Sequence, residues 1–283
     1  MNKNIKIVAD SSSNILELEN VDYASVPLHV IVGEKDFIDD ASVNIDEMQQ
    51  SLSDFKGKTS TSCPSPEEWL AAFGDADIIY CITITSNLSG ANSSANIAKQ
   101  MYEDNYPDKK VYVFDTLSTG PEMALIIDKV KSFVLSGMEP EEIYEKTTEY
   151  MKHTHLYFSL ASLDNFAKNG RVNPLLAKGI GLFGIRIVGK ASEEGTLEPM
   201  DKCRGDKKAF PCIIEHMKKC GYTDGKIVLT HTNYPEGAET LKKLITDTFG
   251  AFNGYIASNN ALCSYYAEPQ SLLIGFEAPS VTE

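Results

Sequence analysis

Short runs of β-branched and other apolar residues alternate with segments of helical periodicity through the first half of the chain. The predicted strands, which have the length and composition of buried strands, are Ile5–Asp10, Ile78–Ile84 and Val111–Asp115. The predicted helices are Glu67–Phe73, Ala91–Tyr102, Glu122–Ser136 and Glu141–Lys152. Strands that alternate with helices in this way predict a parallel α/β sheet.

The second half of the chain has a different order of elements, which begins near His155. The predicted strands there are His155–Leu160, Ile185–Val188, Lys226–Thr230 and Leu272–Phe276, and the predicted helices are Lys208–Lys219 and Gly237–Phe249. This order is typical of an α+β domain, and 283 residues are enough for two domains. The sequence therefore predicts an N-terminal parallel α/β domain over residues 1–155 and a C-terminal α+β domain over residues 156–283.

A loop rich in hydroxyl groups follows the strand Ile78–Ile84 and leads into a helix that begins near Ala91. Ser89 stands at the expected N-cap position, and Gly90 allows a ligand to approach the backbone. Free N–H groups at a helix N-terminus bind carboxylates and phosphates. The pattern predicts an anion site, and an ordinary helix cap is the alternative.

A second hydroxyl-rich loop covers Lys58–Pro64. Directly after it, Ser65 and Glu68 have the spacing of a capping box, so the start of a helix explains both residues. Thr61 and Ser62 precede this cap and have no local structural explanation. These two residues are therefore further candidates for binding a ligand.

Polar residues follow each predicted strand of the first domain. Asp10, the loop Ser86–Ser89 and Asp115 all stand at carboxyl ends of strands, where ligands bind in parallel α/β sheets. The sequence contains no nucleophile-elbow, zinc-protease or phosphate-binding-loop motif. A hydrolase or phosphotransferase that uses Asp10 or Asp115 is nevertheless an alternative reading of this edge.

The charge of the chain restricts its partners. The formal net charge is -14, which argues against nucleic acid or an anionic membrane surface as the main partner, since both attract clustered lysine and arginine. No run approaches the roughly 18 apolar residues of a membrane-spanning helix, and the first residues lack the apolar core of a signal peptide. We expect a cytoplasmic protein with no integral membrane segment.

The sequence predicts neither a metal site nor a nucleotide cofactor. Six cysteines are present without a Cys-x-x-Cys pair, and His216 and Cys220 share a helix face with no second pair of ligands to complete a site. Gly179–Gly184 matches the dinucleotide-binding pattern, but a predicted strand follows it where that pattern requires a helix. The apolar residues inside this motif are candidates for a wall between the domains.

Five motifs in chain order resemble those of the DegV family, and the resemblance extends from about Ile5 to Phe276. The motifs are Val8–Ser12, Thr61–Ser65, Leu88–Gly90 followed by Ser94–Ala95, Gly170–Arg171, and Arg204–Ala209. The resemblance implies a bacterial fatty-acid-binding protein that is not itself an enzyme. It further implies that a long-chain fatty acid lies in an apolar tunnel between the two domains and is the only bound small molecule.

The resemblance also implies a partner and a set of binding residues. In the family, the fatty acid carboxylate is presented to the catalytic subunit of a fatty acid kinase, which converts it to an acyl phosphate. The implied ligand-binding residues are Thr61, Ser62, Ser89, Gly90 and Tyr266, and the residues expected to face the partner and its phosphate are Arg171 and Arg204.

The chain departs from the family pattern near its C-terminus. Tyr266 stands where the family has a histidine, and Glu268 stands where it has a glycine. A phenol donates one hydrogen bond but does not become cationic near neutral pH, and Glu268 is expected to add a negative charge beside the carboxylate. The alternative is therefore a divergent family member that binds another small anionic or hydrophobic metabolite.

Overall fold

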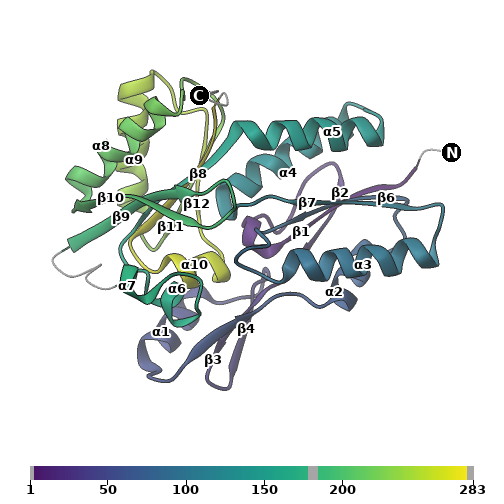
Figure 1. Cartoon of the computed structure of the whole chain (residues 1–283), viewed down its shortest axis with the longest axis horizontal. Helices are drawn as coiled ribbons and strands as arrows, with labels where there is room; N and C mark the ends of the chain where they lie inside the picture. The colour runs from purple at the N-terminus through teal and green to yellow at the C-terminus, as the bar shows by residue number, and fades with distance from the viewer. Residues whose placement is uncertain (1–2, 178–183, 279–283) are drawn as a thin grey trace.

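The structure, a computed structural model, describes residues 3–177 and 184–278. Its strands form three sheets, and Figure 1 shows the helices packed between and around them. Short helical turns lie between the larger elements, at η1 (Ser11–Ser13), η2 (Met151–His153), α6 (Asp164–Lys168) and α7 (Pro174–Ala177). Most of the Gly179–Gly184 motif, with its candidate wall residues, lies outside the described residues.

A parallel sheet forms the N-terminal part of the molecule. Its strands, in spatial order, are β2 (Asp22–Val26), β1 (Ile5–Asp10), β6 (Ile78–Thr83) and β7 (Lys110–Asp115). Helices α2 (Pro66–Phe73) and α3 (Ala91–Asn105) cover one face, and α4 (Gly120–Leu135) and α5 (Pro140–Tyr150) cover the other (Figure 1). Helices on both faces bury every residue of β6, which accounts for its continuous apolar run.

A larger mixed sheet forms the other part of the molecule. Its strands, in spatial order, are β10 (Leu197–Arg204), β9 (Ile185–Ala191), β8 (Thr154–Leu160), β13 (Ser271–Glu277), β11 (Ile227–Thr232) and β12 (Gly254–Ser258). Only the β11–β12 pairing in this sheet is parallel. Helices α8 (Asp206–Lys219) and α9 (Pro235–Phe249) pack on its outer face (Figure 1).

Helix α4 joins the two sheets. It contacts β1 and β6 of the parallel sheet as well as β8, β11 and β13 of the mixed sheet. Gly275 of β13 makes the close approach possible, because a Cβ at this position would lie 2.4 Å from the carbonyl carbon of Pro121. The helix therefore fixes the position of one sheet relative to the other.

A small antiparallel sheet lies beside this pair. Its strands, in spatial order, are β4 (Lys35–Ile38), β3 (His29–Val32) and β5 (Thr59–Ser62), and α1 (Ile45–Asp54) completes the unit. Helix α10 (Ala261–Ala267) comes from the second half of the chain but packs on β3 and α1. The Ala261 N–H donates to Asp39 at 2.6 Å, so α10 is anchored to the first half of the chain.

Each strand and helix predicted from the sequence overlaps an observed element, and the α/β plus α+β fold class is confirmed. The prediction of a loop before Ser65 was wrong in part, since Thr59–Ser62 forms the edge strand β5. Threonine is β-branched and favours strands, and its hydroxyl groups here bond to tyrosines instead of solvent. The domain boundary at residue 155 stays a prediction.

No helix among the described residues is long and apolar enough to cross a membrane.

Candidate functional site

A cavity of about 280 Å³ is enclosed by segments from both halves of the chain. One side is formed by β5 and by the loops that follow β6 and β7; the other is formed by β8, β13, α10 and the turn between β9 and β10. Most of its lining is apolar: Leu28, Ile84, Leu88, Leu117, Leu156, Phe158, Leu160, Phe166, Ala191, Leu197, Leu262, Cys263, Ala267 and Leu273. The cavity therefore offers an apolar ligand a place out of water.

The loops after β6 and β7 are held in place by the two aspartates at the strand ends. The Ile84 N–H donates to Asp10 at 2.7 Å, and the Ser86 N–H donates to Asp115 at 3.1 Å. Burial raises the pKa of Asp10 to about 6, although hydrogen bonds from Ser12 and Ile84 oppose the shift. Neither aspartate lines the cavity, so both carboxylates position loops here, and the geometry gives no support to a hydrolase built on them.

Ser89 and Gly90 lie in the cavity lining where α3 begins. The N-cap residue is Gly90 and not Ser89 as predicted, and no side chain caps the helix. The Ser89 hydroxyl instead accepts a hydrogen bond from the Ala91 N–H at 3.2 Å. A Cβ at Gly90 would lie 2.9 Å from the sulfur of Cys63, so glycine allows the end of β5 to approach the helix N-terminus.

Thr61 and Tyr266 both line the cavity, and their hydroxyl groups form a hydrogen bond. Thr59 and Thr61 alternate with outward residues along β5, and their hydroxyl groups contact Tyr265 at 2.6 Å and Tyr266 at 2.8 Å respectively. The ring of Tyr266 also packs against Phe166, with centroids 4.8 Å apart. Burial raises the pKa of the Tyr266 phenol, and the nearby positive charge of Arg171 partly offsets this effect.

Glu268 does not point into this cavity, contrary to the prediction. Glu268 follows α10 with a positive φ of 61° and is not among the residues that line the cavity. Its carboxylate accepts hydrogen bonds from the Ser162 hydroxyl at 2.9 Å and from the Asn165 N–H at 3.0 Å. The residue thus supports the start of α6 and adds no charge to the cavity wall.

The two predicted arginines have different positions. Arg171 lines the cavity yet is exposed, so it lies where the cavity meets solvent. Its guanidinium donates to the Leu88 carbonyl at 3.1 Å and to the Asn169 carbonyl at 2.5 Å. Arg204 is exposed at the end of β10 and does not line the cavity. The structure therefore brings six of the predicted residues together and leaves Arg204 apart: the six are Thr61, Ser62, Ser89, Gly90, Arg171 and Tyr266.

Comparison with known proteins identifies the family of this chain. A protein-family model described as an uncharacterised protein of the DegV family matches residues 4–278. A DegV domain-containing protein of Streptococcus pneumoniae is 40% identical over 276 residues, which cover 96% of this chain and 98% of the relative. The chain belongs to the DegV family.

Solved DegV structures match the fold of the chain closely. A DegV family protein from Eubacterium eligens, loaded with heptadecanoic acid, has a TM-score of 0.95 and 36% identity, and covers 97% of this chain and 99% of its own. The Streptococcus pneumoniae Fatty Acid Kinase (Fak) B3 protein, loaded with linoleic acid, has the same TM-score and coverage with 39% identity. Both relatives therefore hold fatty acids in a fold like this one.

Sequence reasoning missed one part of this DegV site, the turn between β9 and β10. Its tip reaches the loops of the parallel sheet, where the Asn87 side-chain amide donates to the Glu194 carbonyl at 2.6 Å. Gly195, with φ +73°, lies so close to Thr85 and Leu117 that any Cβ would overlap them. The run Ser192–Thr196 is a polar turn with glycine, a pattern that indicates a hairpin but not what the hairpin touches.

Proposed function

We propose that this DegV chain binds one long-chain fatty acid in the cavity between its two halves and presents the carboxylate to a kinase. The observation that carries the proposal is the mostly apolar cavity, in a chain whose structural relatives at 36% and 39% identity are loaded with fatty acids. Every predicted ligand-binding residue lines that cavity.

The apolar lining supplies the larger part of the expected affinity. Each methylene group transferred from water contributes about 0.8 kcal/mol, so about ten buried methylenes contribute ~8 kcal/mol. This gain exceeds the lower estimates of the cost of association, which begin near ~4 kcal/mol. An acyl chain therefore binds well without any charged group along the walls.

The head group is assigned to the hydroxyl groups beside α3. In the contact between Thr61 and Tyr266, one hydroxyl donates to the other, and the second O–H group remains free to donate to a carboxylate. Ser89 adds another hydroxyl beside the first turn of α3. These neutral donors satisfy a buried carboxylate without a formal positive charge in the apolar cavity.

The position of Arg171 supports a partner that acts on the exposed end of the ligand. Its guanidinium lies where the cavity meets solvent, next to Tyr266 and the loop that contains Leu88. A kinase that transfers a phosphoryl group to the carboxylate would develop negative charge at this opening, which a guanidinium stabilises. Similarity to the Fak B3 protein favours a fatty acid kinase as that partner.

Native mass spectrometry of freshly purified protein tests the proposal. We expect one bound mass that matches a long-chain fatty acid, recovered by denaturing extraction and lost from a Thr61→Ala, Ser89→Ala double variant. Thr59→Val is the matched control, because it removes a neighbouring hydroxyl on β5 that contacts Tyr265 and does not line the cavity.

Two results would count against the proposal. A ligand that is not a fatty acid would favour a divergent member that binds another small anionic or hydrophobic metabolite. A fatty acid that the double variant retains would place the head group elsewhere in the cavity.

A further inference from the structure

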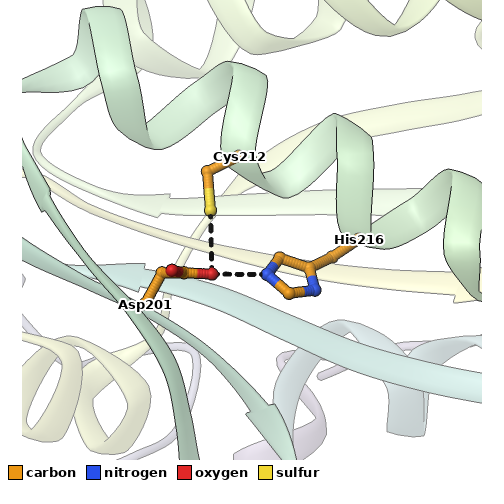
Figure 2. A group of neighbouring side chains, drawn as sticks. All are labelled: Asp201, Cys212 and His216. Atoms are coloured by element: carbon orange, nitrogen blue, oxygen red, sulfur yellow. Dashed lines mark hydrogen bonds and ion pairs between the residues drawn. The ribbon is translucent and has the colours of Figure 1, made fainter.

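A compact group of three side chains lies on the outer face of the mixed sheet, apart from the fatty acid cavity. It consists of Asp201 on β10 with Cys212 and His216 on α8 (Figure 2). The Asp201 carboxylate oxygen Oδ2 lies 2.7 Å from His216 Nε2 and 3.3 Å from Cys212 Sγ. One potential ligand atom from each residue therefore lies within 4.8 Å of the other two.

The local structure explains why these residues meet. Cys212 and His216 are separated by four residues on α8 and so share one face of the helix. Helix α8 packs on β10, and Figure 2 shows both side chains directed toward Asp201 on the strand. The sequence paired His216 with Cys220, but it is Cys212, one turn earlier, that reaches the same carboxylate oxygen.

We propose that Asp201, Cys212 and His216 form a binding site for a divalent cation of the zinc class. Imidazole nitrogen, thiolate sulfur and carboxylate oxygen are the ligands that Zn²⁺ and Co²⁺ take in proteins. Metal–ligand bonds of about 2.0–2.3 Å in a tetrahedron place ligand atoms about 3.3–3.8 Å apart. The observed separations of 2.7 and 3.3 Å need only a small expansion to reach that geometry.

A simple ion pair explains only part of the group. Asp201 and His216 would form such a pair by themselves. The pair does not explain why the half-buried thiol of Cys212 is directed at the same oxygen of the exposed Asp201 carboxylate. Three donors of the kinds that bind zinc, held close together on two regular elements, fit a metal site.

Cys203 lies two residues after Asp201 on β10 but is not part of this group. It is buried in the apolar core against which Cys212 packs. Water would therefore complete the coordination, and the site would keep an open position.

Metal binding at this site balances without any further reactant. When the metal–sulfur bond forms, the S–H bond of Cys212 breaks and its proton passes to solvent, while Asp201 and the imidazole of His216 contribute lone pairs.

Titration of chelator-treated protein with Co²⁺ tests the site. We expect a thiolate-to-cobalt charge-transfer absorption band that saturates at one equivalent and disappears when Zn²⁺ is added. Cys212→Ser should abolish the band, and His216→Gln should weaken Co²⁺ binding at least tenfold. Cys220→Ser is the matched control, because Cys220 also lies at the end of α8 but is not part of the group. This variant should retain the band and the affinity.

The proposal is overturned if the wild type develops no thiolate band, or if the band survives Cys212→Ser and is lost in Cys220→Ser. Fatty acid content, measured on the same samples by extraction, should be unchanged by each of these substitutions. The metal proposal therefore fails or succeeds independently of the proposed lipid function.

Discussion

The contact between Thr61 and Tyr266 provides the sharpest prediction about a single pair of residues. Thr61→Val and Tyr266→Phe each remove one hydroxyl while keeping the shape of the side chain. A hydrogen bond of this kind contributes about 1 kcal/mol, so each variant should weaken fatty acid binding roughly fivefold. The double variant should lose less than the sum of the two, since each hydroxyl acts through the other.

Isothermal titration with a long-chain fatty acid measures this coupling in the two single variants and the double variant. Thr59→Val serves as the control, and we expect it to lower stability but leave the affinity within a factor of two, a change below about 0.5 kcal/mol. Strictly additive losses would show that the two hydroxyl groups bind the ligand independently, and unchanged affinity in all three variants would show that neither binds it.

The sequence allowed the residues of this pair to be predicted, but not their contact. Thr61 and Tyr266 are 205 positions apart, and only the docking of α10 on the small sheet brings them together. For Glu268, the sequence suggested the wrong neighbour. Its charge suggested a repulsive neighbour for a carboxylate, but its side chain instead accepts hydrogen bonds from Ser162 and from the Asn165 N–H in α6.

The hairpin β9–β10 carries a prediction at the scale of an element. Replacement of Gly195 by alanine forces a left-handed backbone on a residue with a Cβ, and the Cβ would meet Leu117 at 2.8 Å. We expect Gly195→Ala to destabilise the protein and weaken fatty acid binding, because the hairpin must withdraw from the cavity. Urea unfolding and the affinity titration measure the two effects.

Gly137→Ala separates the backbone effect from the clash. Gly137 has a similar φ of +71° and nothing within 4 Å of an added Cβ. It should cost about 1 kcal/mol, and Gly195→Ala should cost about 1–3 kcal/mol more. Equal losses in the two variants would mean that the hairpin is not held against the loops after β6 and β7.

Long periodic elements could be predicted from the sequence, whereas short elements could not. The strand β6 and the helix α3 show clear apolar patterns, and both lie where expected. The edge strand β5 is only four residues long and consists of serine and threonine, so composition alone suggested a loop. Its pairing with β3 and its bonds to α10 determine its conformation.

Buried carboxyl groups lie where the two halves of the molecule meet, and they predict that the stability of the whole protein depends on pH. Glu122 on α4 accepts hydrogen bonds from the Ser118 hydroxyl and, at 2.8 Å, from that of Thr154 at the start of β8. Burial raises its pKa from 4.5 to about 7, although these hydrogen bonds oppose the shift. The folded protein thus holds a proton that the unfolded chain releases between these pH values.

Stability from this group is complete below pH 4.5 and is lost as the pH rises through about 7. We expect Glu122→Gln to remove this loss. Between pH 4 and pH 8 the wild type should lose roughly 3 kcal/mol more unfolding free energy than the variant. Urea unfolding across this range measures the difference, and parallel curves would contradict it. Asp10 and Asp39, both with pKa raised to about 6 by burial, should leave a residual slope in the variant.

The arrangement of the two halves depends on long-range packing that local patterns do not encode. The sequence indicated an α/β unit followed by an α+β unit, and the sheets follow that order. It did not indicate that α4 would contact both sheets or that α10 would return to the small sheet. Helix α10 lines the cavity, and α4 fixes the two sheets relative to each other, so the sequence predicted the cavity only through the family resemblance.

The most direct test of the account is the ¹³C NMR signal of carboxyl-labelled oleate bound to the protein. We predict one bound carboxyl resonance that moves in Ser89→Ala and in Tyr266→Phe but stays in place in Arg204→Gln, since Arg204 does not line the cavity. A bound resonance that ignores the first two substitutions, or that follows the third, would contradict the placement of the fatty acid head group.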